Sequence, residues 1–201
     1  HNGGTRTAAR PEGSPDHPLA SEVKGNQLAD FTADFFEACM DAGKFPIVEN
    51  PAPTGRYPKL WNTDHEPQHV RAACERSLKD LGLEYFDLYL IHFPIALEYV
   101  DPAERYPAGW VNPAEENAAM KPIQVSYADT WAAMEELVDA GLVKRIGVCN
   151  LTAAGLRDVL SYARIKPSVL QVEMHPYLCQ NALLRYAQSE DIAVTAFSPF
   201  G

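Results

Sequence analysis

Polar side chains stand at or just past the carboxyl end of each short apolar run in the second half of the chain. His92 follows the run 85–91, and Asn150 follows the run 145–149. The other members of this set are Cys149, Gln171, Glu173, His175 and Ser198. A histidine in such a place is either a buried structural residue or a group that orients a substrate or moves a proton. The pattern predicts a site assembled from several strands, with His92 as its first candidate.

The elements that must carry these residues alternate along the chain. Apolar runs at 85–91, 145–149, 169–173 and 192–197 predict strands, and the amphipathic segments between them predict helices over 67–81, 127–140, 153–163 and 180–189. This alternation predicts a parallel α/β sheet, and the repeat length suits a barrel or a doubly wound sheet. No Gly-x-Gly-x-x-Gly turn is present. The strand-end residues therefore favour a (β/α)8 barrel, or TIM barrel.

Several residues have predicted structural roles only. Gly82 and Gly141 are expected to end helices, Ser126 with Asp129 to form a capping pair, and Thr152 to cap the helix after it. His65 and His69 are expected on a helix surface, as are Glu135 and Glu136. No carboxylate or cysteine spacing pairs with the histidines, so no metal site is predicted. The four cysteines, 39, 74, 149 and 179, are expected to be small buried hydrophobes.

The first part of the chain differs from the rest. Residues 1–26 are rich in Gly, Pro, Ser and charge, 26–43 have the spacing of one amphipathic helix, and 46–58 carry four prolines. We therefore predict an irregular leader over 1–58 and a folded domain over 59–201. A long insertion at 95–125 interrupts the βα alternation. Because it contains Trp110, we expect it to form a lid that faces the substrate.

Composition limits the class of function. The 201 residues are 46% hydrophobic and carry a net charge of −10, which fits a globular protein and argues against a nucleic-acid surface. No apolar run approaches the roughly 18 residues of a membrane span. The absence of Cys-x-x-Cys spacing favours a reducing cytoplasm. The chain begins without an initiator Met or an apolar signal region, so we expect a processed or partial sequence.

Five motifs together resemble the aldo-keto reductase family. They are Lys59-Leu-Trp-Asn, Asp87-Leu-Tyr-Leu-Ile-His-Phe-Pro, Ile146-Gly-Val-Cys-Asn, Leu170-Gln-Val-Glu-Met-His-Pro-Tyr and Thr195-Ala-Phe-Ser. The segment Tyr99–Trp110 resembles the fungal D-xylose reductase branch in particular. The resemblance covers about 59–201. It implies an oxidoreductase of carbohydrate metabolism that reduces an aldehyde or open-chain sugar with NADPH, or with NADH in some members.

The same resemblance implies roles for individual residues. Lys59 and His92 match two of the four family catalytic residues: the Lys lowers the pKa of a proton-donating phenol, which otherwise titrates near 10, and the His orients the carbonyl. Asn150 and Gln171 match the residues that hold the nicotinamide carboxamide. The implied cofactor set also contains Cys149, where a Ser is usual, Phe197, where a Tyr usually stacks on the ring, and Ser198. Phe93 and Trp110 match apolar residues of the substrate pocket.

Several parts of the family pattern, both catalytic residues and strands, have no counterpart in the sequence. The proton-donating Tyr and its Asp should precede Lys59, and we do not accept Tyr57 in their place. Family strands one and two and the last strand are also unmatched. We therefore expect a truncated barrel that is inactive alone, because open sheet edges favour aggregation or pairing. The alternative is a non-catalytic remnant that binds a homologue or another partner. Exact substrate, NADPH-versus-NADH preference and oligomeric state are not predicted.

Overall fold

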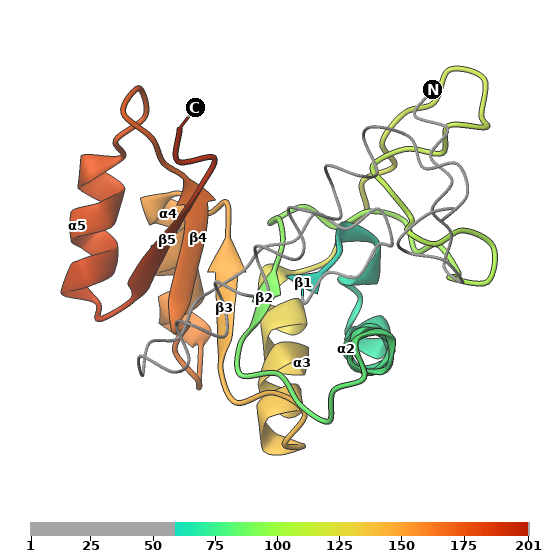
Figure 1. Ribbon diagram of the computed structural model, residues 1–201, viewed down its shortest axis with the longest axis horizontal. Coiled ribbons are helices and arrows are strands. Elements are labelled where there is room, and N and C mark those ends of the chain that lie inside the picture. The colour runs from blue at the N-terminus through green and yellow to red at the C-terminus, as the bar shows by residue number, and fades with distance from the viewer. Residues whose placement is uncertain (1–58, 201) are drawn as a thin grey trace, which may run out of the picture. The chain divides into compact units, whose positions relative to one another are not determined.

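A computed structural model describes residues 59–200, which belong to the compact unit Gly55–Gly201. The leader predicted over 1–58, its helix at 26–43 and Cys39 lie outside the described residues. The described part of the chain holds a sheet of five parallel strands in the order β1-β2-β3-β4-β5 (Figure 1). The strands are β1 (Lys59–Leu60), β2 (Tyr89–Ile91), β3 (Ile146–Cys149), β4 (Val169–Glu173) and β5 (Ala193–Phe197). The predicted parallel sheet is confirmed, and β1 is a fifth strand that the four predicted strands did not include.

Each pair of successive strands is joined through one α-helix. The helices are α2 (Pro67–Leu81), α3 (Tyr127–Asp139), α4 (Ala153–Tyr162) and α5 (Asn181–Ser189), and a short 3-10 helix, η1 (Asn62–Asp64), follows β1. Right-handed crossovers between neighbouring parallel strands place successive helices on the same face of a sheet. Accordingly α2 contacts α3, α3 contacts α4 and α4 contacts α5. This strand order and helix layer are those of consecutive βα units of a barrel.

Local sequence explains where most elements begin and end. Pro67 occupies the first turn of α2, and Gly82 ends that helix in a left-handed conformation with φ +67°. The Thr152 side chain accepts a hydrogen bond from Gly155 N at 3.2 Å, so its predicted cap is confirmed. The predicted capping pair at Ser126 is wrong, because the Ser126 side chain makes no capping hydrogen bond.

Strand β2 is shorter than the predicted run 85–91. Phe86 makes one isolated parallel bridge to Val143, and the continuous ladder starts only at Tyr89. Between these points Asp87 is exposed and pairs with Lys144 at 2.8 Å, which turns this stretch to the surface. Four residues at the start of the run are therefore outside the strand, while its carboxyl end lies where the sequence placed it.

The core lies between the sheet and the helix layer. Trp131, Met134 and Leu137 of α3 pack there with Val70, Cys74 and Leu78 of α2 and with the strand residues Leu60, Tyr89, Ile91, Ile146 and Leu170. The central strand β3 is held especially close to its neighbours. A Cβ added to Gly147 would stand 2.6 Å from Val169 O, so glycine is required there by the tight packing.

Three predictions of surface position or burial are wrong. His65 is 2% exposed, because the chain turns inward after η1, whereas His69 one turn later is half-buried. Glu135 is 7% exposed and faces the α3–α4 side of the core, while Glu136 is exposed. Cys74 and Cys149 are buried thiols, but Cys179 is exposed because it lies in the turn between β4 and α5.

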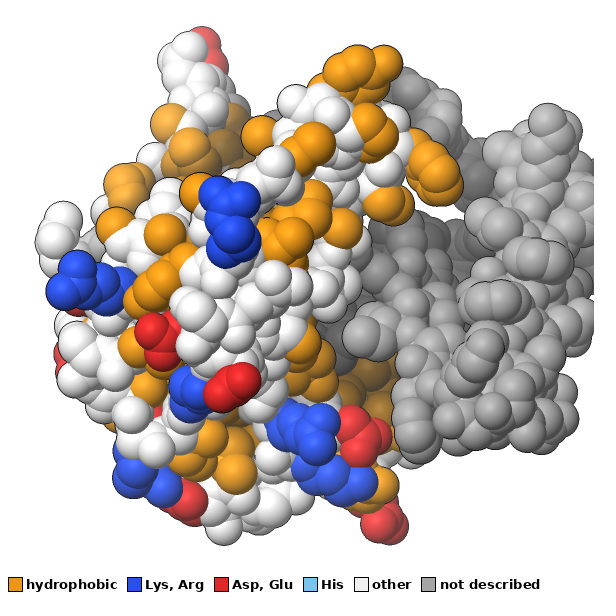
Figure 2. All heavy atoms as spheres, turned by 90° about the vertical axis from the view of Figure 1, so that its left-hand side faces the viewer, with side chains coloured by type: hydrophobic (Ala, Val, Ile, Leu, Met, Phe, Trp, Pro, Cys, Tyr) orange, Lys and Arg blue, Asp and Glu red, His pale blue; other side chains and the backbone are white. Residues whose placement is uncertain are grey.

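The surface around α5 and β5 is chemically mixed. Figure 2 shows hydrophobic side chains interspersed with Lys, Arg, Asp and Glu on this face. Within residues 59–200, no helix is long and apolar enough to cross a membrane.

Candidate active site

The predicted site residues follow the carboxyl edge of the sheet from β1 to β5. Lys59 begins β1, His92 comes directly after β2, and Gln171 lies within β4. The remaining predicted cofactor residues are Cys149, which ends β3, Asn150 after it, Phe197, which ends β5, and Ser198 after it. Because parallel strands end at the same edge, their terminal side chains lie near one another.

Lys59 and Gln171 are in direct contact. The Lys59 ammonium donates to Gln171 Oε1 at 2.6 Å, and the two side chains are 8% and 5% exposed. Three ladder steps separate β1 from β4, about 14 Å on a flat sheet at roughly 4.8 Å per step. Contact across that span requires both side chains to point inward over the same face of the curved sheet. The sheet thus joins a residue of its first strand to one of its fourth.

Asn150 ties together three neighbouring strands. Its side-chain Nδ2 donates to His92 O at 2.8 Å, and its backbone N donates to Gln171 O at 2.9 Å. Its φ of +59° lies in the left-handed region, which Asn tolerates better than most residues. The thiol of Cys149 also lies 3.7 Å from Gln171 Oε1. The ends of β2, β3 and β4 are therefore held in a fixed relation around the two amide side chains.

Four rings form an aromatic cluster beside this edge, which we define as Trp61, His92, Phe93 and Trp110. The His92 ring centroid lies 4.9 Å from those of Trp61 and Phe93. Trp110 packs edge-on against Trp61 at 5.4 Å and Phe93 at 4.9 Å. Trp61 was not predicted as a site residue. Its position two residues after Lys59, on the same side of an extended chain, was the sequence signal that could have found it.

The insertion 95–125 is an ordered excursion whose two ends are bonded together. Leu97 bridges Pro122, and Ile123 N donates to Ala96 O at 3.0 Å. Its middle reaches β1, where Trp61 Nε1 donates to Gly109 O at 3.2 Å. Trp110, which remains 37% exposed, therefore faces both the aromatic cluster and solvent.

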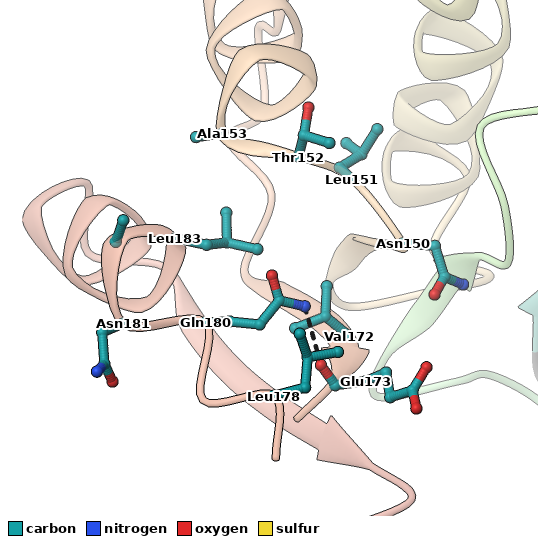
Figure 3. A pocket seen from close by; sticks show the side chains of 11 residues that line it. Asn150, Leu151, Thr152, Ala153, Val172, Glu173, Leu178, Gln180, Asn181 and Leu183 are labelled. Carbon is teal, nitrogen blue, oxygen red and sulfur yellow. Dashed lines mark hydrogen bonds between the residues drawn. The ribbon is translucent and has the colours of Figure 1, made fainter. Parts of the chain in front are cut away.

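Two cavities lie near this edge, and among the residues assigned to the catalytic, cofactor and substrate sites only Lys59, Trp110 and Asn150 line them. One, of about 240 Å³, is lined by Lys59, Trp61, Trp110 and the segment before Trp110. The other, of about 560 Å³, lies where β3 and β4 meet the first turns of α4 and α5 (Figure 3). Of the strand-end residues that predict the site, Asn150 and Glu173 line the larger cavity. In Figure 3 Gln180 points toward the end of β4, where its Nε2 donates to Glu173 O at 2.9 Å.

Phe197 and Ser198 lie farther along the edge. Phe197 pairs with Glu173 in the β4–β5 ladder, and Ser198 has a φ of +48°. Within residues 59–200, no side-chain hydrogen bond links Ser198 to the other predicted site residues. The fold brings these two residues to the correct edge without placing them in the Lys59–Gln171 group.

Burial sets the charge state of groups behind the site. Desolvation lowers the pKa of His65 from 6.5 to about 4, against a smaller opposing effect of a hydrogen bond with the Phe93 backbone. Desolvation also raises the pKa of Asp64, although Arg76 donates to both of its oxygens at 3.3 Å and acts in the opposite direction. His65 is therefore neutral and buried, and it contacts the backbone of Phe93, the residue after His92. Residues 59–200 contain no group of three His, Cys, Asp or Glu side chains arranged to hold a metal.

Comparisons with known proteins agree with this geometry. The family model described as "Aldo/keto reductase family" matches residues 30–201, so its match begins upstream of Lys59. A D-xylose reductase of Pyricularia oryzae, named as NAD(P)H-dependent, is 54% identical over 143 residues, which are 71% of this chain and 44% of that protein. A probable D-xylose reductase of Aspergillus fumigatus shows the same values, and a 4-dihydromethyl-trisporate dehydrogenase of Mucor mucedo is 52% identical.

Solved structures give the same result. An aldose reductase from Schistosoma japonicum superposes with a TM-score of 0.63 at 43% identity, covering 70% of this chain and 44% of that one. A Bombyx mori aldo-keto reductase in complex with NADP superposes with a TM-score of 0.60 at 38% identity, covering 71% and 40%. The chain thus spans less than half the length of these relatives. Five parallel strands, these neighbours and the family match confirm the predicted partial barrel, and the chain belongs to the aldo/keto reductase family.

Proposed function

We propose that this chain carries the cofactor-holding and carbonyl-orienting part of an NAD(P)H-dependent reductase of aldehydes or open-chain aldoses. The observation that carries the proposal is the 2.6 Å contact of Lys59 with Gln171, close to the Asn150–His92 hydrogen bond. One group of contacts thereby connects the residues assigned to the carbonyl with those assigned to the cofactor. The family membership and the names of the relatives support the same reaction class.

The residues present fit a nicotinamide. Asn150, just after β3, and Gln171, within β4, stand side by side, and amide side chains offer both a donor and an acceptor to a carboxamide. Phe197 would stack on the ring from β5, and Cys149 and Ser198 complete the proposed cofactor set. When bound, the reduced nicotinamide supplies a hydride to the carbonyl carbon.

The proposed roles at the carbonyl follow from charge and reach. His92 donates a hydrogen bond to the carbonyl oxygen and so fixes its orientation, while Trp61, Phe93 and Trp110 form apolar walls that exclude water. The Lys59 ammonium stabilises negative charge on the group that delivers the proton.

A titration with NADPH tests the cofactor part of the proposal. We expect micromolar binding with quenched tryptophan fluorescence, because the aromatic cluster adjoins the proposed nicotinamide site. Gln171→Leu should weaken binding about tenfold, since it removes a polar partner of the carboxamide and leaves Lys59 without that acceptor. Gln188→Leu, which makes the same change at an exposed position near the end of α5, is the matched control and should bind as the unchanged chain does. No binding up to millimolar NADPH would instead favour the non-catalytic remnant.

Turnover separates the two halves of the proposal. Loss of reduced-nicotinamide absorbance with D-xylose, abolished in His92→Ala, would assign the whole reaction to this chain. We expect binding without measurable turnover, because no residue of the sequence was matched to the family's proton-donating Tyr. D-xylose is only the first probe. Relatives named for a sugar and for a trisporate derivative have nearly equal identity to this chain, 54% and 52%.

A further inference from the structure

Tyr106 connects the segment 100–110 to helix α2. Its hydroxyl donates to Asp80 Oδ2 at 3.0 Å, and the Arg76 guanidinium lies 5.4 Å from the centre of its ring. Arg76 is in turn held by both carboxylate oxygens of Asp64. Because the inner face of α2 is part of the core, Tyr106 connects a surface loop to a rigid element.

The carboxyl end of the same segment contacts the aromatic cluster. Gly109 has a φ of +70°, which favours glycine, and its carbonyl accepts the Trp61 indole N–H. Trp110 then packs against Trp61 and Phe93. Only three residues separate Tyr106 from Trp110, so a shift at the α2 anchor is transmitted over a short stretch of chain to the indole.

We propose that Tyr106 is a positioning residue that holds the segment 100–110 on α2 so that Trp110 closes the aromatic cluster beside His92. The proposal rests on the proposed function only where it treats Trp110 as a wall of the substrate pocket. Tyr106 contacts α2, whereas Trp110, four residues later in the same segment, contacts the aromatic cluster. Tyr106 itself lines the cavity of about 240 Å³ with Trp61 and Trp110, where it acts by holding the segment in place, so it is a positioning residue and not a catalytic one.

The expected effect is moderate. Tyr106 is 41% exposed, so its bond to a charged partner competes with water. Removing the hydroxyl in Tyr106→Phe keeps the ring over Arg76 and should weaken sugar binding about three- to tenfold.

Fluorine NMR of 5-fluorotryptophan-labelled full-length chain provides a direct measurement. The protein has three tryptophans, Trp61, Trp110 and Trp131, and the Trp110→Phe variant identifies the Trp110 signal. Tyr106→Phe should shift or broaden the signals of Trp110 and Trp61. Trp131, buried in the core at 1% exposure, is the internal reference and should not change.

Conservative variants separate positioning from a general loss of structure. Asp80→Asn keeps an oxygen acceptor for the Tyr106 hydroxyl, so its Trp110 signal should stay close to that of the unchanged chain. Asp80→Ala removes the acceptor and should change the Trp110 signal as Tyr106→Phe does. Tyr177→Phe removes a hydroxyl from a residue that is 90% exposed and should alter none of the three signals.

Sugar titration distinguishes failure of this proposal from failure of the proposed function. In NADP⁺-loaded protein, D-xylose should move the Trp110 signal, and Tyr106→Phe should require three- to tenfold more sugar. An unchanged Trp110 signal in Tyr106→Phe overturns the positioning role, whether or not sugar binds. In a third outcome, the Trp110 signal differs between Tyr106→Phe and the unchanged chain but does not respond to sugar in either. That result supports the positioning role of Tyr106 and rejects Trp110 as part of the substrate pocket.

Discussion

At the scale of single residues, the contact between Lys59 and Gln171 unites the two halves of the candidate site. Gln171 Oε1 accepts from the Lys59 ammonium at 2.6 Å and lies 3.7 Å from the Cys149 thiol. A hydrogen bond to a charged donor is stronger than one between neutral groups. Gln171 is therefore fixed in one orientation, which a residue that must present an amide to a ligand requires.

His65 gives a prediction about pH at this scale. Burial lowers its pKa from 6.5 to about 4, so between these values the unfolded chain binds more protons than the folded one. Stability is then complete above about pH 6.5 and declines as the pH falls toward 4. At about 1.4 kcal/mol for each unit of pKa, the loss is roughly 3 kcal/mol. Urea unfolding between pH 7 and pH 4.5 should show this decline, and His65→Leu should flatten it.

The neighbouring groups define the control for that experiment. Asp64 has a raised pKa, so its protonation favours the folded state as the pH falls and acts against His65 near the acidic limit. His69→Gln replaces a nearby half-buried histidine in α2 and should leave the pH dependence of the free energy of unfolding unchanged. An equal slope in the unchanged chain and in His65→Leu would contradict the assignment to His65.

At the scale of elements, Glu135 joins helix α3 to the turn before β4. Its Oε1 accepts from Ile165 N at 2.8 Å, and its other oxygen lies 3.5 Å from Arg164. Arg164 also pairs with Asp139 on α3 at 2.6 Å. The carboxylate thus satisfies a backbone donor that no strand or helix of its own can pair, and it fixes where the chain enters β4.

A pair of adjacent glutamates tests this connection. Glu135→Ala should lower the free energy of unfolding by about 1–3 kcal/mol, because Ile165 N–H loses its acceptor in a partly buried place. Glu135→Gln keeps that acceptor and should cost less. Glu136→Ala, on the exposed side of the same helix, should stay within about 0.5 kcal/mol of the unchanged chain in urea unfolding. Equal losses of unfolding free energy in Glu135→Ala and Glu136→Ala would contradict the connection of Glu135 to the turn before β4.

At the scale of the whole molecule, five strands contribute to one edge, so a ligand bound there is coupled to folding of the sheet. A ligand that binds only the folded state stabilises it according to its concentration, by about 2.7 kcal/mol at 100 times the Kd. We expect NADPH at that ratio to raise the free energy of unfolding by this amount. Asn150→Ala, which removes the bond to His92 O, should lose most of the gain. Thermal unfolding with and without NADPH measures it, and a Tm independent of NADPH would contradict the proposed cofactor site.

The sequence by itself determined the order of elements and the residues at their carboxyl ends. Apolar periodicity, Pro67, Gly82 and Thr152 act within a few residues, so α2, α4, β3 and β4 could be read locally. The five motifs were likewise sufficient to indicate the family. The same local reading placed His92, Asn150 and Gln171 along one edge of the sheet, whereas Lys59 was assigned only through the family motif and no strand was predicted there.

Only the tertiary structure decided which of these residues meet. The Lys59–Gln171 contact depends on the curvature of a sheet built from segments 112 positions apart in the sequence, and no local pattern encodes it. The burial of His65 and Glu135 depends on how η1 and α3 pack against later elements, so a surface prediction from helical spacing failed. Trp61 joined the aromatic cluster because the distant segment 100–110 returns to it. Contacts between remote segments are set by packing of the whole sheet and helix layer, and that is where sequence periodicity stops being informative.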